Sequence, residues 1–309
     1  MGELEQRAAT REKIAVMAQP PQRKMHSLEG IVAACALVLV LVASIGFAQA
    51  DELKQIKLRS ASVLVQDADT GEIVYDKNSD AVVPIASITK LMTAMVLLDK
   101  VKSAGLDLEQ RIVLSRADVD RVKGTRSRLR TGASFTRDEL LMLALMASEN
   151  KAAAALGRTY PGGIDAFVGA MNQKAAALGM GDSRFVDSTG LSSGNVSSAR
   201  DLAKLVAAAH EYERVRDYSV KSRATVRMGK RVLHFGNTNG LVRNARWDIG
   251  LSKTGYISEA GRCLVMRVRM ASKDMIVVLL DSWGKHSRIG DANRLRKWLE
   301  SSASVNRPG

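Results

Sequence analysis

Strand-like and helix-like segments follow one another in blocks along this chain, and this order constrains the fold more than any other feature. An alternating segment at 62–66 turns at Gly71 and returns at 72–75, the pattern of a β-hairpin. Helical patterns dominate from 85 to 210, and strand-like segments follow at 225–228, 232–235, 249–253, 264–270 and 275–280. A last amphipathic helix is expected at 288–299. The sequence therefore predicts an α/β (α+β) fold in which both chain ends complete one sheet that helices cover.

The helical block carries its own start and stop signals. Pro84 precedes an apolar stretch over 85–98, which predicts a buried helix beginning near Ser87. Further helices are expected up to Met146, over 164–178 and over 202–210. Two capping boxes are expected at the starts of such helices, formed by Thr136 with Glu139 and by Ser198 with Asp201.

The N-terminus indicates the compartment. Residues 31–48 form an uncharged apolar run, preceded by Arg23 and Lys24 and followed by Ala48-Gln49-Ala50. This order of charge, apolar core and small residues is typical of a signal peptide, here residues 1–50, and predicts an exported, periplasmic protein. Because the run is close to the length that spans a bilayer, an uncleaved anchor stays open. We expect one domain over 51–300 and a polar, disordered tail over 301–309.

Composition excludes several classes of protein. Cys35 and Cys263 are the only cysteines, and no HExxH string joins the four histidines, so a disulfide scaffold and a zincin are both excluded. No metal or organic cofactor is implied. The chain has 46 Lys and Arg against 32 Asp and Glu, most densely between Arg121 and Arg130. Export argues against nucleic acid as the partner, so the excess charge suits an anionic polymer instead.

Ser87 and Lys90 are the first candidates for chemistry. Their spacing of i and i+3 places both side chains on one face of a helix. A lysine that is buried near the positive end of a helix tends to lose its proton. The neutral amine could then take the proton of Ser87 and make its oxygen nucleophilic. Alone, this motif is more typical of a capping serine followed by a snorkelling lysine than of a catalytic pair.

Two further motifs change this interpretation: Ser148-Glu149-Asn150 after a helix, and Lys253-Thr254-Gly255 at the end of a strand. Ser148 could relay a proton between Lys90 and a leaving amine, and Asn150 could hold Lys90 and a substrate amide. Lys253 could lower the pKa of Lys90 and, with Thr254, bind a substrate carboxylate. Gly255 would let a substrate backbone pair with the strand, and the N–H groups of Ser87 and Tyr256 would form an oxyanion hole.

With these motifs in this order, the chain resembles the low-molecular-weight penicillin-binding DD-peptidases, closest to the penicillin-binding protein 7/8 type of D-alanyl-D-alanine endopeptidase. The resemblance covers about residues 62–300. It rests on the strings at 84–96, 143–150, 160–163, 178–180, 184–186, 189–191, 195–197, 237–239 and 253–255. Glu149 departs from the Ser-Asp-Asn form of the class A β-lactamases.

The resemblance implies a β-lactamase/transpeptidase-like fold, with an antiparallel sheet flanked by helices and a helical subdomain. It implies a DD-peptidase catalytic domain at 51–300 that acts on peptidoglycan stem peptides and cross-links through an acyl group on Ser87. Penicillin and other β-lactams would inhibit it covalently. Lys285 and Arg288 lie where relatives often have a carboxylate-binding cation. A lipoprotein or wall-synthesis partner stays open.

Several alternatives remain. A D-alanyl-D-alanine carboxypeptidase would use the same acylation chemistry. A β-lactamase needs a glutamate between the second and third motifs to activate water, but Glu211 and Glu213 are the only glutamates there. A non-catalytic penicillin-binding sensor would keep the fold without the chemistry, although all six polar motif positions are intact.

Overall fold

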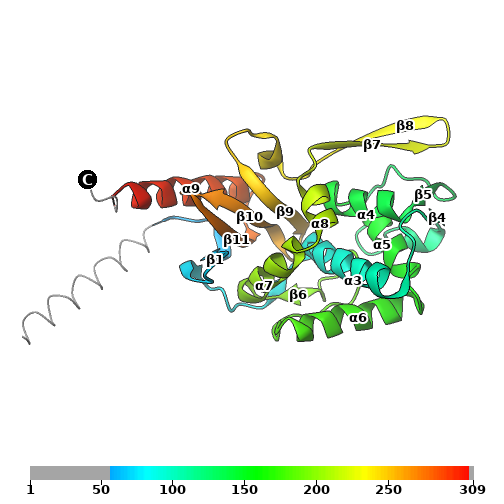
Figure 1. Cartoon of the computed structure of the whole chain (residues 1–309), viewed down its shortest axis with the longest axis horizontal. Helices are drawn as coiled ribbons and strands as arrows, with labels where there is room; N and C mark the ends of the chain where they lie inside the picture. Colours follow the sequence, from blue (N-terminus) through cyan, green and yellow to red (C-terminus); the bar gives the residue numbers. More distant parts are fainter. Residues whose placement is uncertain (1–55, 306–309) are drawn as a thin grey trace, which may run out of the picture. The chain divides into compact units, whose positions relative to one another are not determined.

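The computed structural model of this protein describes residues 56–305. Its centre is a five-stranded antiparallel sheet in the order β2-β1-β11-β10-β9 (Figure 1). Strands from both ends of the described chain therefore lie side by side, as the sequence predicts. The strands are β1 (Ser60–Asp67), β2 (Ile73–Lys77), β9 (Asp248–Ile257), β10 (Gly261–Met270) and β11 (Lys273–Ser282).

Both faces of the sheet are covered, so its central strands are apolar in nearly every position. One face packs on α9 (Ser287–Val305), with Leu295 among Val65, Leu264 and Leu279. The other face packs on α7 (Ala199–His210) and the helical part of the molecule. The remaining helices are η2 (Ala86–Ile88), α3 (Thr89–Ala104), η3 (Arg116–Asp118), α4 (Arg137–Met146), α5 (Asn150–Arg158), α6 (Gly163–Ala177), α8 (Glu213–Val220) and η4 (Gly240–Arg243).

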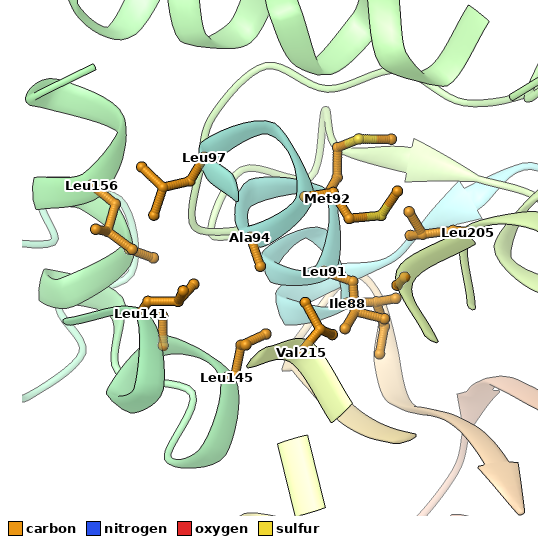
Figure 2. Packing of buried hydrophobic residues seen from close by; sticks show 14 of the residues in the cluster. Ile88, Leu91, Met92, Ala94, Leu97, Leu141, Leu145, Leu156, Leu205 and Val215 are labelled. Atoms are coloured by element: carbon orange, nitrogen blue, oxygen red, sulfur yellow. The ribbon is translucent and has the colours of Figure 1, made fainter. Parts of the chain in front are cut away.

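Helix α3 lies at the centre of the helical part. Its apolar side chains are buried on all sides, which explains an apolar pattern without a polar face. Figure 2 shows the side chains of Leu91 and Leu97 among residues from α4, α5, α7 and α8. Because α3 follows Ser87 directly, this packing holds the serine in place.

Short strand pairs complete the fold. They are β3 (Val83–Pro84) with β6 (Val196–Ser197), β4 (Arg111–Val113) with β5 (Ser134–Thr136), and β7 (Arg223–Met228) with β8 (Arg231–Gly236). The last pair was expected in the main sheet, and that prediction is wrong. Ala224, Val226 and Met228 of β7 instead pack on the helical part, so the hairpin buries its apolar face without a third strand.

Some boundaries also differ from the sequence predictions. Strand β9 continues to Ile257, so Lys253-Thr254-Gly255 lies within the strand and does not end it. Helix α9 runs to Val305, so the first residues of the expected tail are helical; the hydroxyls of Ser301 and Ser302 donate to the carbonyl of Trp298. Helices α5 and α8 were not predicted. The signal peptide expected over 1–50 and the tail residues 306–309 lie outside the described residues.

The two predicted helix caps have different outcomes. The capping box of Thr136 and Glu139 is present in both directions. Ser198 accepts the N–H of Asp201, but the Asp201 carboxylate accepts from Asp182 and Ser183 and does not close the box. Within residues 56–305, no helix combines the length and the apolar composition needed to cross a bilayer.

Asp291 of α9 links this helix to the start of β1 by hydrogen bonds. Its buried carboxylate accepts the N–H of Arg59 at 3.0 Å and both the N–H and the hydroxyl of Ser60 at 2.7 Å. We expect Asp291→Ala to lower the free energy of unfolding by about 3 kcal/mol, because it leaves buried donors unpaired. Ser60→Ala removes one of these bonds and should cost about 1 kcal/mol. Urea unfolding measures both, and equal costs would contradict this role for Asp291.

Candidate active site

Ser87 lies in η2, between the strand β3 and helix α3. The preceding residue, Ala86, has a φ of 48°, which is unusual for a residue other than glycine. Two segments of backbone pack directly against this turn, and each has a glycine at the point of contact. A Cβ at Gly190 would lie 2.0 Å from the carbonyl oxygen of Ala86, and one at Gly255 would lie 2.8 Å from that of Ile85. Ser87 is therefore presented on a strained turn that neighbouring backbone holds in place.

Lys90 is fully buried and points at Ser87, as the i, i+3 spacing predicts. Its Nζ donates to Ser87 Oγ at 2.8 Å, to Asn150 Oδ1 at 2.7 Å and to the carbonyl of Thr189 at 2.6 Å. Burial lowers the pKa of Lys90 to about 7, against an opposing effect of nearby carboxylates, of which Asp187 is the largest. A substantial fraction of Lys90 is therefore neutral near pH 7.

Ser148 and Glu149 lie in the turn between α4 and α5, and Asn150 begins α5. Ser148 has a φ of 56°, and the Glu149 side chain caps α5 by accepting the N–H of Lys151. Asn150 is the first residue of α5, and its amide holds Lys90 with one end and donates to Thr125 Oγ1 at 2.9 Å with the other. The turn thus aims its serine and asparagine side chains at one site.

Lys253 approaches from β9, at the edge of the sheet. Its Nζ donates to Ser148 Oγ at 2.8 Å and to the carbonyl of Thr254 at 2.9 Å. Burial lowers its pKa well below the ordinary value, and the positive charges of Lys90 and Arg288 lower it further. Because repulsion between two buried ammonium groups is mutual, the two lysines titrate as a coupled pair.

This arrangement modifies two sequence-based expectations. Ser148 hydrogen-bonds Lys253, and its hydroxyl is not among the three partners of Lys90. The lowered pKa of Lys90 arises from burial, whereas the charge repulsion acts most clearly on Lys253. The sequence places the two lysines in one site but cannot assign their individual contacts.

The next residues of β9 line the edge of the sheet. Thr254 Oγ1 lies 2.6 Å from Thr238 Oγ1, and Gly255 packs against the turn that carries Ser87. The Tyr256 side chain is 58% exposed, with the Arg262 guanidinium 4.5 Å from the centre of its ring. As the last strand in the sheet order, β9 is hydrogen-bonded to one neighbour only, which suits the addition of an extended peptide.

Arg288 and Lys285 differ in position. Arg288 Nη1 donates to the carbonyls of Gly255 and Cys263, so its guanidinium lies against the strand that carries Lys253. Burial lowers the pKa of Arg288, and the charge of Arg262 adds to the effect. Lys285 is exposed. The structure therefore brings Arg288, and not Lys285, into contact with the motif strand.

Some neighbours of the site were given no role from the sequence. Asp187 accepts the N–H groups of Thr189 and Gly190 at 2.6 Å and so shapes the loop whose Thr189 carbonyl contacts Lys90. Thr125 belongs to a loop that also pairs Lys123 with Glu259, in the turn after β9. A backbone carbonyl leaves no mark in a sequence, although the Thr-Gly-Leu string at 189–191 was noted as part of the resemblance.

The arrangement can perform nucleophilic acyl transfer. A hydroxyl lies beside a lysine that is partly neutral at pH 7, and a second serine and a second lysine lie next to them. Ser87, Lys90, Ser148, Asn150, Lys253 and Thr254 come together as the sequence predicts. Within residues 56–305, no three His, Cys, Asp or Glu side chains are arranged to hold a metal ion.

Comparison with known proteins identifies the family. The profile of the D-alanyl-D-alanine carboxypeptidase family matches residues 48–284, so the chain belongs to this family. The D-alanyl-D-alanine endopeptidase of Pseudomonas aeruginosa is 48% identical over 249 residues, covering 80% of this chain and 79% of that protein. The D-alanyl-D-alanine endopeptidase of Escherichia coli is 44% identical over 256 residues, covering 82% and 81%. The predicted family resemblance is thereby confirmed.

A solved structure supports the predicted fold class. The crystal structure of the Streptomyces K15 DD-transpeptidase is similar to this structure with a TM-score of 0.73 and 26% sequence identity. The match covers 80% of this chain and 99% of that one. The expected antiparallel sheet flanked by helices is confirmed.

The pKa of Lys90 predicts a pH profile. We expect acylation of Ser87 by a fluorescent penicillin to rise as the pH passes through about 7, because only neutral Lys90 can accept the serine proton. Glu149→Gln removes a carboxylate that raises this pKa, so the midpoint should move to lower pH. Glu72→Gln, on the exposed β1–β2 turn, is the matched control. A rate independent of pH between about 6 and 9 would exclude Lys90 as the base.

The close approach of Gly190 to Ala86 predicts a second outcome. We expect Gly190→Ala to lower the free energy of unfolding by more than about 2 kcal/mol and to slow acylation, because its Cβ would strike the Ser87 turn at a φ of +78°. Gly169→Ala, in α6 with no atom within 4 Å of the added Cβ, should stabilise by up to about 1 kcal/mol. Thermal unfolding and acylation assays measure both variants, and a fully active Gly190→Ala enzyme would refute this constraint.

Proposed function

We propose that this member of the D-alanyl-D-alanine carboxypeptidase family is a serine endopeptidase that hydrolyses D-Ala–diaminopimelate cross-links of peptidoglycan. The observation that carries the proposal is the hydrogen bond from fully buried Lys90 to Ser87 Oγ, with a pKa of about 7 at the lysine. The endopeptidase names of the two relatives described above support the choice of a cross-link as substrate.

In the proposed acylation step, neutral Lys90 takes the proton of Ser87 while Ser87 Oγ attacks the D-Ala carbonyl carbon. Asn150 and the Thr189 carbonyl both accept from Lys90, so they stabilise the ammonium group that forms. The C–N bond then breaks, the D-Ala carbonyl stays on Ser87 as an ester, and the leaving nitrogen needs one proton. We assign the delivery to Ser148, which relays to the leaving nitrogen the proton that Lys90 took from Ser87, so that Lys90 is neutral and Ser148 is a hydroxyl again at the end of the step. Lys253 donates a hydrogen bond to Ser148 Oγ and holds it in position for this transfer. Water then hydrolyses the ester and regenerates Ser87.

Substrate binding is assigned to the exposed edge of β9. An extended peptide can add there as a further strand because Gly255 has no side chain in its way. Lys253 and Thr254 attract the substrate carboxylate, and binding of that anion favours the charged form of Lys253. Asn150 orients a substrate amide, and the backbone N–H groups of Ser87 and Tyr256 are assigned to the oxyanion.

The surroundings of the reaction follow from the same proposal. The signal peptide at 1–50 directs export to the periplasm, where the domain at 51–300 meets its polymer. β-Lactams react with Ser87 as covalent inhibitors. The reaction needs no metal or organic cofactor, since the serine and the lysine pair supply the nucleophile and the proton transfers.

The second candidate is D-alanyl-D-alanine carboxypeptidase activity on stem pentapeptides. The name of the matching family favours it, because it describes that reaction. The same acyl-enzyme would form on Ser87, and the leaving group would be a terminal D-Ala instead of a cross-linking amine. A β-lactamase is disfavoured because Glu211 caps the end of α7 and Glu213 begins α8, so both are committed to helix ends.

The decisive experiment offers the purified protein two muropeptides and analyses the products by mass spectrometry. We expect conversion of a D-Ala–diaminopimelate cross-linked dimer into monomers, and loss of at least about 1,000-fold in rate in Ser87→Ala. Release of D-Ala from a monomer ending in D-Ala-D-Ala, with the dimer untouched, would make the protein a carboxypeptidase. Labelled penicillin bound without turnover of either muropeptide would favour the sensor.

A further inference from the structure

Two neighbouring segments carry a strong excess of positive charge. Residues 121–130 contain five Lys and Arg and no Asp or Glu, and residues 221–236 contain five Lys and Arg and no Asp or Glu. The first segment is the loop before β5, and the second forms the hairpin β7–β8, which projects from the helical part in Figure 1. We call six exposed cations of these segments the basic surface: Arg126, Arg130, Arg223, Arg227, Lys230 and Arg231.

The side chains of the basic surface have no acidic partners. Across residues 56–305, none of the six makes an ion pair, and none of their charged groups donates a hydrogen bond. Two arginines elsewhere in the described residues are paired, by contrast: Arg200 binds Asp76 and Asp80, and Arg214 binds Asp138. Because two neighbouring segments hold six unpaired cations and contain no Asp or Glu, this face is strongly positive.

The two segments of the basic surface are held together. The Arg128 guanidinium lies 4.1 Å from the centre of the Phe235 ring and donates to the carbonyl of His234. The N–H of Arg130 points to the sulfur of Met228 at 3.4 Å. Because apolar residues of β7 are buried on this side, Arg223 and Arg227 lie on the outer face of the hairpin.

Both segments are also joined to the candidate active site. Thr125, in the loop, accepts the amide of Asn150, the residue that holds Lys90. Thr238, just after the hairpin, contacts Thr254 through their hydroxyls at 2.6 Å, and its N–H donates to the carbonyl of Met146 at the end of α4. The two segments that carry the basic surface therefore both contact residues of the candidate active site through Thr125 and Thr238.

We propose that the basic surface binds peptidoglycan strands outside the candidate active site, through the free carboxylates of their stem peptides. The proposal rests on the proposed function, because it takes the polymer that carries the scissile cross-link as the occupant. A single exposed ion pair contributes little, but several such pairs on one polymer raise the effective concentration of neighbouring cross-links at Ser87. A soluble dimer carries no further cross-links tethered to it, so it does not gain effective concentration from this surface.

A membrane surface is the less suitable partner. Within residues 221–236, Val232 is the only large apolar side chain that is strongly exposed, so the hairpin has little apolar surface to insert among lipids. The loop likewise exposes one large apolar side chain, Val122, among its five Lys and Arg residues, so charge dominates both segments and suits an anionic polymer.

The test reverses charge on the outer face of β7. We expect the double variant Arg223→Glu/Arg227→Glu to bind intact sacculi about tenfold more weakly at low salt and to digest them correspondingly more slowly. Its kcat/KM on the soluble cross-linked dimer should stay within about twofold of the parent. The matched control, Lys57→Glu/Lys297→Glu, makes the same change in net charge at exposed sites elsewhere and should leave both activities unchanged.

The remaining outcomes overturn one proposal or the other. Equal sacculus binding and digestion by the parent and the double variant would overturn the basic surface, as would an equal loss in the control. Loss of binding to vesicles of anionic lipid, with sacculus binding retained, would assign the surface to a membrane. Failure of the parent to cleave cross-links in both the soluble dimer and the sacculi would overturn the endopeptidase proposal, whereas sacculus binding by the two variants would still decide the surface.

Discussion

Lys90 and Lys253 are both buried at one site, where the helical part of the molecule meets the edge of the sheet. Burial lowers the pKa of both lysines, and the positive charge of Lys90 lowers the pKa of Lys253 further. Lys90 is held by Ser87, Asn150 and the Thr189 carbonyl, and Lys253 is held by Ser148 and its own strand. These acceptors stabilise the ammonium form of whichever lysine is protonated, while burial keeps part of Lys90 neutral near pH 7.

The helical part and the sheet must pack accurately against each other to bring the two lysines and Ser87 into one site. The helical part supplies Lys90, Ser148 and Asn150, and the edge of the sheet supplies Lys253. Glycine at 190 and at 255 permits the contact, because a side chain at either position would meet the backbone of the Ser87 turn. Helix α3, which follows the Ser87 turn, is packed on all sides in the core and so fixes the position of that turn (Figure 2). Rigidity at the serine is therefore a consequence of packing several residues away.

Sequence reasoning recovered the parts of this design that local chemistry specifies. The i, i+3 relation of Ser87 and Lys90 follows from helix geometry, and the cap at Thr136 follows from its hydrogen bonds with Glu139. Sequence reasoning failed where the structure of a segment depends on contacts with residues far away in the chain. Strand-like residues in β7 and β8 fit a sheet as well as a separate hairpin, and only the packing of Val226 on the helical part distinguishes the two. Likewise Asp201 could have closed a capping box, but its carboxylate accepts the backbone N–H of Asp182 and the hydroxyl of Ser183 instead.

Residue type and spacing along the chain were enough to predict the strands of the main sheet at both chain ends, the three motifs and the family to which they belong. The packing of the fold determines that Ser148 contacts Lys253, that a backbone carbonyl at Thr189 holds Lys90, and that two basic segments distant in the chain contact one site through Thr125 and Thr238. Such relations join residues that are far apart in the chain. Their contacts depend on how the halves of the fold pack, which no local pattern records.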